Sequence, residues 1–136
     1  MEIRKATTKD ADQIATVLVE SYNISTVQEG KRVFNDEVQK KYNYIVAEIE
    51  GKIIGIVTWQ IHGLPKHGLC ELDRIAVLPN FRGKGVSRQL FQALQDEAKK
   101  AYEQQSEKLR KLYLLTHADN KRAQKFYEKL GFRHET

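Results

Sequence analysis

The sequence predicts a mixed-sheet α/β domain, and two observations about the order of its segments lead to this prediction. Segments rich in β-branched and aromatic residues come first and are joined by short turns, as in an antiparallel sheet. After them a strand, a long amphipathic helix, a short apolar strand and a last helix alternate, as in an α/β unit. The length of 136 residues suits one domain of ordinary size, so we expect a single domain over residues 1–136.

The N-terminal part is expected to hold one short strand and two helices. Residues 2–6 are predicted to form the strand. A helix is predicted to begin after Thr8, because apolar residues recur there at helical spacing, namely Ala11, Ile14, Ala15, Leu18 and Tyr22. Phe34 and Val38 lie one turn apart, which indicates a second, short helix before residue 40.

Three strands follow. Residues 44–48 and 53–59 are predicted to form a hairpin, closed by a tight turn at Glu50 and Gly51 because glycine accepts a positive φ. The segment 62–68 is predicted to be a loop. A long strand is expected over residues 69–78, and Pro79 ends it.

The C-terminal part alternates helix and strand. Apolar residues repeat at helical spacing from Val86 to about residue 104, with polar residues on the other face, so this helix is expected to pack on a sheet. The apolar run 112–116 is typical of a buried strand. A last helix is predicted around Ala123–Leu130, stopped by Gly131, and Phe132 is expected to begin another strand.

Composition excludes several classes of protein. Hydrophobic residues make up 40% and charged residues 30%, which argues against a disordered chain, and no apolar run approaches the ~18 residues of a membrane-spanning helix. Cys70 is the single cysteine, so a reducing, cytoplasmic location is expected. The formal net charge of +5 favours an anionic ligand. A basic nucleic-acid-binding domain is an alternative, but we expect no nucleic-acid partner because no motif for one is recognised.

The strongest chemical signal is the loop Arg82–Ser87, which joins the long strand to the long helix. Its glycines let a bulky anion approach the backbone, and the unpaired N–H groups at the start of the helix point at that anion. A nucleoside-triphosphate loop needs Ser or Thr after its lysine, and Gly85 follows Lys84 instead. A dinucleotide fingerprint needs glycine where Arg88 stands. The alternative reading is an ordinary helix start.

This loop resembles the Arg/Gln-x-x-Gly-x-Gly/Ala signature of the GNAT superfamily of N-acetyltransferases, except that Ser87 stands where the family prefers Gly or Ala. The segment 120–132 is similar to the family block Asn-x-x-Ala-x-x-Phe-Tyr-x-x-x-Gly-Phe, and residues 71–77 resemble its central strand. Together these stretches cover roughly the C-terminal half of the chain in the family's order.

The resemblance implies a mostly antiparallel twisted sheet that splays between two parallel strands, here 69–78 and 112–116, with helices on both faces. It implies an acetyl-CoA-dependent N-acetyltransferase that needs no metal and acts on a primary amine. The pantetheine arm would bond to the backbone of Ile75, Ala76 and Val77. The residues implied for the pyrophosphate are Arg82, Gly83, Lys84, Gly85, Val86 and Ser87, and those implied on the last helix are Asn120, Phe126 and Tyr127.

Two catalytic roles follow from the resemblance. Tyr127 is the implied general acid, which protonates the departing thiolate. Asn120 lies seven residues before it, close to two helical turns, so the two are expected to share a helix face. Glu71 holds the family's acidic position and is the expected base, although Asp73, on the same face of the strand, or water alone is an alternative. The alternative to a catalytic role is that both carboxylates are solvated charges on the face of the sheet, or that Asp73 pairs with Arg4 or Arg74.

The amine acceptor is left open by the sequence. Residues 71–75 look similar to polyamine acetyltransferases, while protein amines and amine antibiotics remain alternatives. A catalytically silent CoA-binding sensor is the second functional hypothesis. The family pattern commonly continues through one more strand than a chain ending at Thr136 contains. The alternatives are that the chain is cut short and lacks its last strand, that a partner subunit supplies this strand, or that the domain is minimal, and an open strand edge favours a homodimer. No membrane partner is expected.

Overall fold

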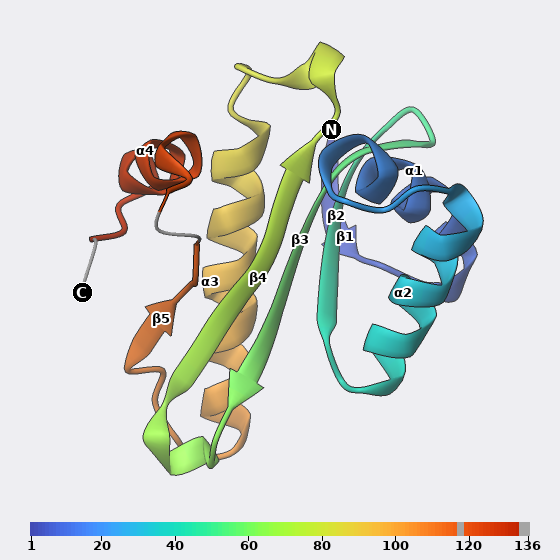
Figure 1. Ribbon diagram of the computed structural model, residues 1–136. Helices are drawn as coiled ribbons and strands as arrows, with labels where there is room; N and C mark the ends of the chain where they lie inside the picture. The colour runs from blue at the N-terminus through green and yellow to red at the C-terminus, as the bar shows by residue number, and fades with distance from the viewer. Residues whose placement is uncertain (117–118, 134–136) are drawn as a thin grey trace.

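The computed structural model describes residues 1–116 and 119–133, and these form one five-stranded sheet with the strand order β1-β2-β3-β4-β5. Figure 1 shows the long strands β3 and β4 crossing the middle of the molecule. Neighbouring strands run antiparallel, except that β4 and β5 are parallel. The strands are β1 (Glu2–Lys5), β2 (Asn43–Ile49), β3 (Lys52–His62), β4 (Leu69–Val77) and β5 (Lys111–Tyr113).

Helices cover both faces of this sheet, so the predicted mixed α/β architecture is confirmed. On one face lie α1 (Ala11–Ser21) and α2 (Val27–Gln39), and on the other lies α3 (Val86–Gln104) (Figure 1). The last helix described, α4 (Lys121–Lys129), lies beyond the edge strand β5. Short 3-10 turns precede α1 and flank β4, at Thr8–Asp10, Pro65–His67 and Pro79–Phe81.

Each face of the sheet has its own hydrophobic core. Between the sheet and α3 the fully buried side chains include Trp59, Leu90 and Leu94. Between the sheet and the N-terminal helices they include Ile14 and Leu18. Burying a side chain of this size contributes roughly 1.5–3 kcal/mol, so the two cores hold the helix layers on the sheet.

Most predicted elements occur near their expected positions. The strand predicted over 69–78 is β4, the helix predicted from Val86 to about 104 is α3, and the hairpin turns at Glu50 and Gly51, both with positive φ. The second helix is longer than predicted, with 13 residues. It begins after Thr26, whose hydroxyl accepts the N–H of Glu29 at 3.1 Å and so caps the helix.

Three strand predictions differ from the structure. The strand expected at 112–116 is β5, which begins at Lys111 and ends at Tyr113, because residues 114–116 leave the sheet. Phe132 does not begin a strand within the described residues, since it packs against the core on the α3 side instead. The strand β3 also extends to His62, into the segment predicted as a loop.

The separation of β4 from β5 positions the candidate site. Their parallel pairing spans three register positions and stops where Glu71 faces Tyr113. Beyond that point β4 continues from Leu72 to Val77 without β5 beside it. One edge of this six-residue segment is therefore open, and the splay implied by the family resemblance is confirmed. None of the helices within the described ranges is long and apolar enough to cross a membrane.

Candidate active site

The open edge of β4 presents the backbone groups of Ile75 and Val77. Tyr22 fixes the direction of Ile75, because the Tyr22 hydroxyl donates to the Ile75 carbonyl and accepts the Ile75 N–H, both at 3.0 Å. The Val77 carbonyl accepts the Nε–H of Arg82 at 2.8 Å. Strand alternation therefore turns these two residues outward and turns the peptide groups of Ala76 toward β3.

The three strand residues expected in the cofactor site thus differ in what they can offer. Ile75 and Val77 present peptide groups at the open edge, while their side chains are buried against α3. Ala76 offers no group to a ligand at the open edge. Its peptide groups face β3, and its methyl group packs in the other core, on the side of α1. A ligand lying along this edge would bond to Ile75 and Val77.

The loop between β4 and α3 has the geometry of an anion site. Gly83 and Gly85 both have positive φ, of 76° and 83°, and no heavy atom lies within 4 Å of where a Cβ would be at either position. Among the residues that the structure describes, no side chain caps the N-terminus of α3, and no acidic residue lies in its first turn. Free N–H groups at the positive end of the helix dipole suit a phosphate. Val86 is buried and anchors the helix start, while Ser87 is half-buried.

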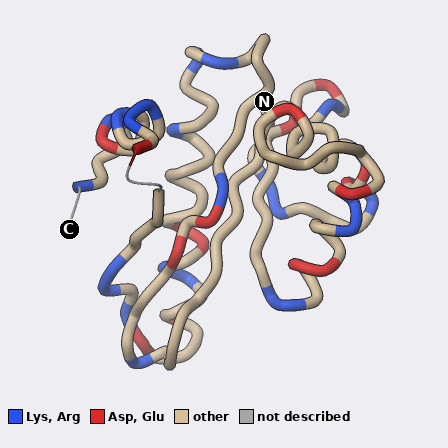
Figure 2. The backbone as a smooth tube through the Cα atoms, viewed as in Figure 1, with Lys and Arg blue, Asp and Glu red and all other residues tan. Residues whose placement is uncertain are grey.

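Basic residues belong to this loop and to the start of α3, where Figure 2 shows blue segments. Arg82 is tied to the end of β4 through its Nε, and Lys84 lies over the Phe81 ring with its Nζ 5.8 Å from the centroid. Arg88 is engaged elsewhere, because its guanidinium donates to the carbonyl of Lys129 at 3.2 Å, near the end of α4. The loop residues Arg82 and Lys84 are thus the exposed cations nearest the glycines.

A β-bulge brings polar side chains together beside the open edge. In the pairing of β3 with β4, Thr58 faces Arg74 and Trp59 faces Leu72, so Asp73 is an extra residue on β4. The bulge directs Asp73 and Arg74 to the same face, the one covered by α2. Figure 2 shows the acidic and basic segments of β4 side by side at this point.

The charges on this face have defined partners. Arg74 donates to both carboxylate oxygens of Glu37 in α2, at 2.6 and 2.9 Å. Gln60 donates to Asp73 at 3.1 Å. The alternative in which Asp73 pairs with Arg4 or Arg74 is therefore not what the structure shows. Arg74 is held by Glu37, and Arg4 is held by other carboxylates, those of Asp10 and Glu48.

The two candidate bases differ in their surroundings. The pKa of Asp73 is raised to about 6, chiefly by burial and also by the neighbouring charges of Glu71 and Glu37, against the lowering effect of the hydrogen bond from Gln60. Within the described part of the chain, Asp73 Oδ2 is buried and has no hydrogen-bond partner. Glu71 instead has an oxygen 2.6 Å from Nε2 of His62, and its side chain is 14% exposed. Neither carboxylate is the solvated surface charge that the sequence left as an alternative.

Tyr127 lies on α4, half-buried against the core on the α3 side. Burial raises the pKa of its hydroxyl, so the group is protonated at neutral pH. Its ring makes an edge contact with Phe126, at 5.2 Å between centroids, and Phe126 itself is 37% exposed. Asn120 precedes α4 rather than lying in it, and its Oδ1 caps the helix by accepting the N–H of Ala123 at 3.1 Å.

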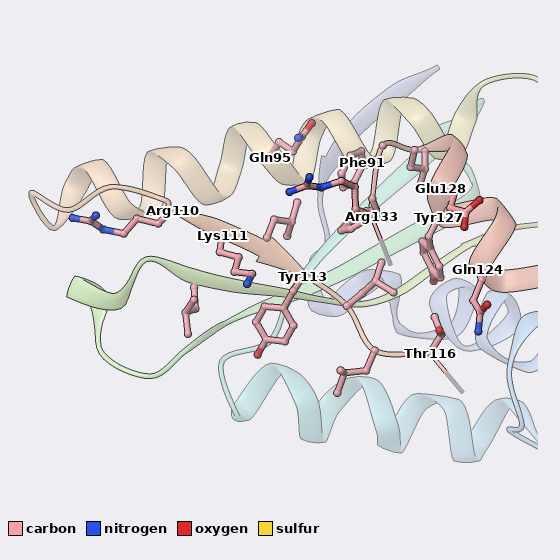
Figure 3. A pocket seen from close by; sticks show the side chains of 17 residues that line it. Phe91, Gln95, Arg110, Lys111, Tyr113, Thr116, Gln124, Tyr127, Glu128 and Arg133 are labelled. Carbon is pink, nitrogen blue, oxygen red and sulfur yellow. The ribbon is translucent and has the colours of Figure 1, made fainter. Parts of the chain in front are cut away.

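A groove of about 820 Å³ borders Tyr127. It is bounded by α3, by β5 and by α4 with the segment after it, and Figure 3 shows Tyr127 projecting into it from α4, toward the coil that follows β5. No residue of the loop Arg82–Ser87 lines this groove, and neither does Ile75 or Val77. The groove therefore does not include the open edge of β4 from Leu72 to Val77.

Several residues have plain structural roles. Cys70 is fully buried on the α3 face, and burial raises the pKa of its thiol to about 12, so it is a core residue as expected. His117 and His134 lie outside the described residues. Within residues 1–116 and 119–133, no three His, Cys, Asp or Glu side chains gather as a metal site would need.

Sequence reasoning missed three residues of this site. Tyr22 was predicted only as one of the apolar positions of the first helix, and Gln60 and His62 received no role beside the candidate bases. Alternation along β3 offered a signal for Gln60 and His62, because both follow Trp59 on the strand that pairs with residues 69–77. No local signal places the Tyr22 hydroxyl, because its partner lies 53 residues away.

Comparison with known proteins agrees with this geometry. Residues 40–134 match the family model described as an acetyltransferase (GNAT) domain. An uncharacterized N-acetyltransferase of Archaeoglobus fulgidus is 33% identical over 140 residues, which cover 93% of this chain and 89% of the relative. The uncharacterized N-acetyltransferase YjgM of Escherichia coli is 32% identical over 143 residues, covering 97% and 81%.

Solved structures share the fold. The aminoglycoside N-acetyltransferase AAC(6')-Iy in complex with CoA matches with a TM-score of 0.80 at 20% identity, over 99% of this chain and 89% of that one. The PaiA N-acetyltransferase of Thermoplasma acidophilum in complex with coenzyme A matches with a TM-score of 0.76 at 21% identity, over 98% and 90%. The protein belongs to the GNAT family of N-acetyltransferases, enzymes that move an acetyl group from acetyl-coenzyme A to an amine.

The residues present fit that cosubstrate. The glycines of the loop leave open space where side chains would otherwise stand, and uncapped N–H groups follow them at the start of α3. The strand β4 leads away from this loop with one edge open, so a long arm bound at the loop by its phosphates can lie along Val77 and Ile75.

Proposed function

We propose that the protein acetylates a primary amine of the polyamine or peptide kind, and that the amine enters on the α2 face of β4, beside Asp73. The observation that carries this proposal is the state of Asp73. Its carboxyl group lies on the separated segment of β4, has a pKa raised to about 6, and keeps one oxygen buried without a hydrogen-bond partner in the described chain. Such a group is prepared to accept a proton.

An amine needs this help. A lysine-like amine has a pKa of about 10.4, so removing its proton at pH 7 costs roughly 4.6 kcal/mol. A carboxylate beside the amine lowers that cost by accepting the proton directly or through water. Glu71, the base expected from the sequence, has an oxygen in contact with His62 and is less free to do so. We therefore assign the base to Asp73 and give Glu71 the role of adding negative charge beside it.

Tyr127 supplies the second proton transfer in this proposal. The protonated amine first gives one proton to Asp73, directly or through water. As the neutral nitrogen bonds to the acetyl carbon and the carbon–sulfur bond breaks, the departing thiolate receives a proton from Tyr127, and the second proton lost by the nitrogen passes back to Tyr127 through water. The sulfur resembles a cysteine thiolate with a pKa of about 8.5, and the buried Tyr127 hydroxyl keeps its proton at neutral pH. Arg82, Gly83, Lys84, Gly85, Val86 and Ser87 would hold the pyrophosphate, and Asn120 and Phe126 would border the arm.

Charge favours a cationic acceptor over an acidic one. Arg74 is neutralised by Glu37, which leaves the carboxylates of Asp73 and Glu71 as the net charge beside the open edge. Relatives are named for different acceptors, among them an aminoalkylphosphonate N-acetyltransferase and an N-alpha-acetyltransferase. An amine with further positive charge gains from these carboxylates, whereas a phosphonate is repelled.

Purified protein, acetyl-CoA and a panel of amines test the proposal by the release of free coenzyme A thiol and the mass of the product. The panel contains spermidine, a peptide with a free N-terminus, an aminoglycoside and an aminoalkylphosphonate. We expect turnover with spermidine or the peptide and little with the phosphonate. If acetyl-CoA bound but no amine were acetylated, the proposal of an active enzyme would be rejected in favour of a CoA-binding sensor. No measurable affinity for coenzyme A would remove the cofactor assignment itself.

A further inference from the structure

A tyrosine side chain occupies the open edge of β4 where a neighbouring strand would otherwise bond. In a sheet, the N–H and C=O of one residue both bond to the strand beside it. Here the Tyr22 hydroxyl serves both groups of Ile75, as acceptor for the N–H and as donor to the carbonyl, at 3.0 Å each. One hydroxyl thus takes the place of one residue of an absent strand.

Tyr22 is held in this position from both ends. Its backbone N–H bonds to the carbonyl of Leu18 at 2.9 Å and ends α1, and its extended backbone turns the chain there. Its ring faces the guanidinium of Arg74, with Cζ 5.7 Å from the centroid, and Arg74 is fixed by Glu37. Burial and the nearby Tyr127 raise the pKa of the Tyr22 hydroxyl, so it remains a neutral donor and acceptor.

The Ile75 N–H is a single donor, and two acceptors compete for it. An extended arm that lies along the open edge of β4 needs this N–H, because Ile75 and Val77 are the residues that present peptide groups there. The Tyr22 hydroxyl already accepts it. At the loop Arg82–Ser87, none of the described side chains caps the helix start, so the adenosine and phosphate parts of coenzyme A meet no such competitor among them.

We propose that the Tyr22 hydroxyl satisfies Ile75 in the free protein and is exchanged for the pantetheine arm when the cosubstrate binds. Tyr22 thereby determines how tightly the arm, but not the nucleotide, is held. This inference rests on the proposed function, because it requires coenzyme A to lie along β4. It makes Tyr22 a positioning residue of the cosubstrate site, 53 residues from its partner in the sequence.

Calorimetry with two ligands tests the exchange. Adenosine 3′,5′-bisphosphate carries the nucleotide without the arm, whereas coenzyme A carries both. In Tyr22→Phe the competitor is gone and Ile75 is unsatisfied in the free protein, so we expect coenzyme A to bind roughly three- to thirtyfold more tightly. The affinity for adenosine 3′,5′-bisphosphate is expected to stay unchanged. Unchanged or weaker binding of coenzyme A to a folded Tyr22→Phe protein would overturn the proposal.

Tyr102→Phe is the matched control. The Tyr102 hydroxyl also donates to a carbonyl of β4, that of Leu69, but at the end where β4 is still paired with β5. Removing it is expected to lower the melting temperature without changing the affinity for either ligand. If Tyr102→Phe tightened coenzyme A binding as much as Tyr22→Phe, the effect would reflect a loosened sheet, and the exchange would be rejected.

A measurement on the wild-type protein keeps the proposal testable if Tyr22→Phe does not fold. The amide signal of Ile75 in a ¹H–¹⁵N spectrum reports the partner of its N–H. We expect this signal to move when coenzyme A is added and to stay in place with adenosine 3′,5′-bisphosphate. If the Ile75 signal does not move while coenzyme A binds, the exchange does not occur. If the wild type binds neither ligand, the proposed function fails, which is a different outcome.

Discussion

Gln60 and Asp73 are joined across the β3–β4 pair, where Gln60 Nε2 donates to Asp73 Oδ1 at 3.1 Å. This bond lowers the pKa of Asp73, while burial, the larger effect, raises it to about 6. The balance of the two places the proton-accepting range of the carboxylate just below neutral pH.

The first prediction concerns the pH dependence of the rate. A base must be deprotonated to act, so kcat/KM is expected to rise with pH through about 6 and then level off. Asp73→Asn removes this rise and lowers kcat/KM by about 10²–10⁴-fold. Gln60→Leu removes the donor and moves the rise to higher pH. A pH–rate profile for each variant gives the answer.

His62 supplies the control for that profile, because its imidazole is an ionisable group in contact with Glu71, beside Asp73. His62→Gln is expected to keep the rise near pH 6. If His62→Gln abolished the rise while Asp73→Asn kept it, the assignment of the base to Asp73 would be wrong.

The second prediction concerns stability. The folded-state pKa of Asp73 is about 6, above the value of about 3.9 for an unfolded chain. Between these pH values the folded protein binds more protons than the unfolded chain, so the wild type loses stability as pH rises from about 4 to 6. Asp73→Asn removes this loss. We expect it to raise the free energy of unfolding at pH 7 by about 1 kcal/mol, after allowance for solvent screening, and by nothing near pH 4. Urea unfolding of the wild type and Asp73→Asn at pH 4 and pH 7 measures this. If the difference in free energy of unfolding between the two proteins were the same at both pH values, the prediction would be contradicted.

The third prediction separates chemistry from binding at Tyr127. Tyr127→Phe is expected to lower kcat by about 10²–10⁴-fold and to leave the affinity for acetyl-CoA nearly unchanged, because only the proton donor is lost. Steady-state rates and calorimetry measure the two effects. Tyr113→Phe, in the same groove, is the control and is expected to change kcat by less than about threefold. Wild-type turnover in Tyr127→Phe would end its assignment as the acid.

The fourth prediction concerns the glycine loop. Gly85→Ala places a side chain at a positive φ of 83° and at the point where we propose that the phosphates approach the backbone. We expect affinity for coenzyme A and for adenosine 3′,5′-bisphosphate to fall about tenfold or more. Gly51→Ala is a matched control, because Gly51 has a φ of 81° and equally open space, but lies in the β2–β3 hairpin. Both variants should lose about 1 kcal/mol of stability, with only Gly85→Ala losing affinity.

The sequence predicted those features that depend on local patterns. Helical periodicity located α3, and glycine with an amphipathic helix behind it located the loop at Gly83 and Gly85, because turn chemistry and amphipathicity are written in neighbouring residues. The predicted extent of β5 was wrong, because an apolar run in the sequence does not indicate where pairing with β4 stops. That limit is set by contacts between distant segments.

In the candidate site, too, features set by neighbouring residues were predictable and features set by contacts between distant segments were not. Asp73 and Glu71 were recognisable as carboxylates on one strand, but the bulge that gives Asp73 and Arg74 a common face appears only in the register with β3. The partners of those charges, Gln60 and Glu37, come from other elements. Pairings over such separations leave no periodic trace in the sequence, so the pKa of Asp73 was not predictable from it.

The bulge at Asp73 also means that the sheet does not need this residue for its alignment. Thr58 faces Arg74 and Trp59 faces Leu72, so the positions on β3 are matched in order without residue 73. A chain shortened by that one residue would keep the same facing pairs with β3 on both sides of the gap and would lose a single carboxyl group. The proposed proton acceptor is thus an insertion, and selection can alter or remove it while the partners of its neighbours stay as they are.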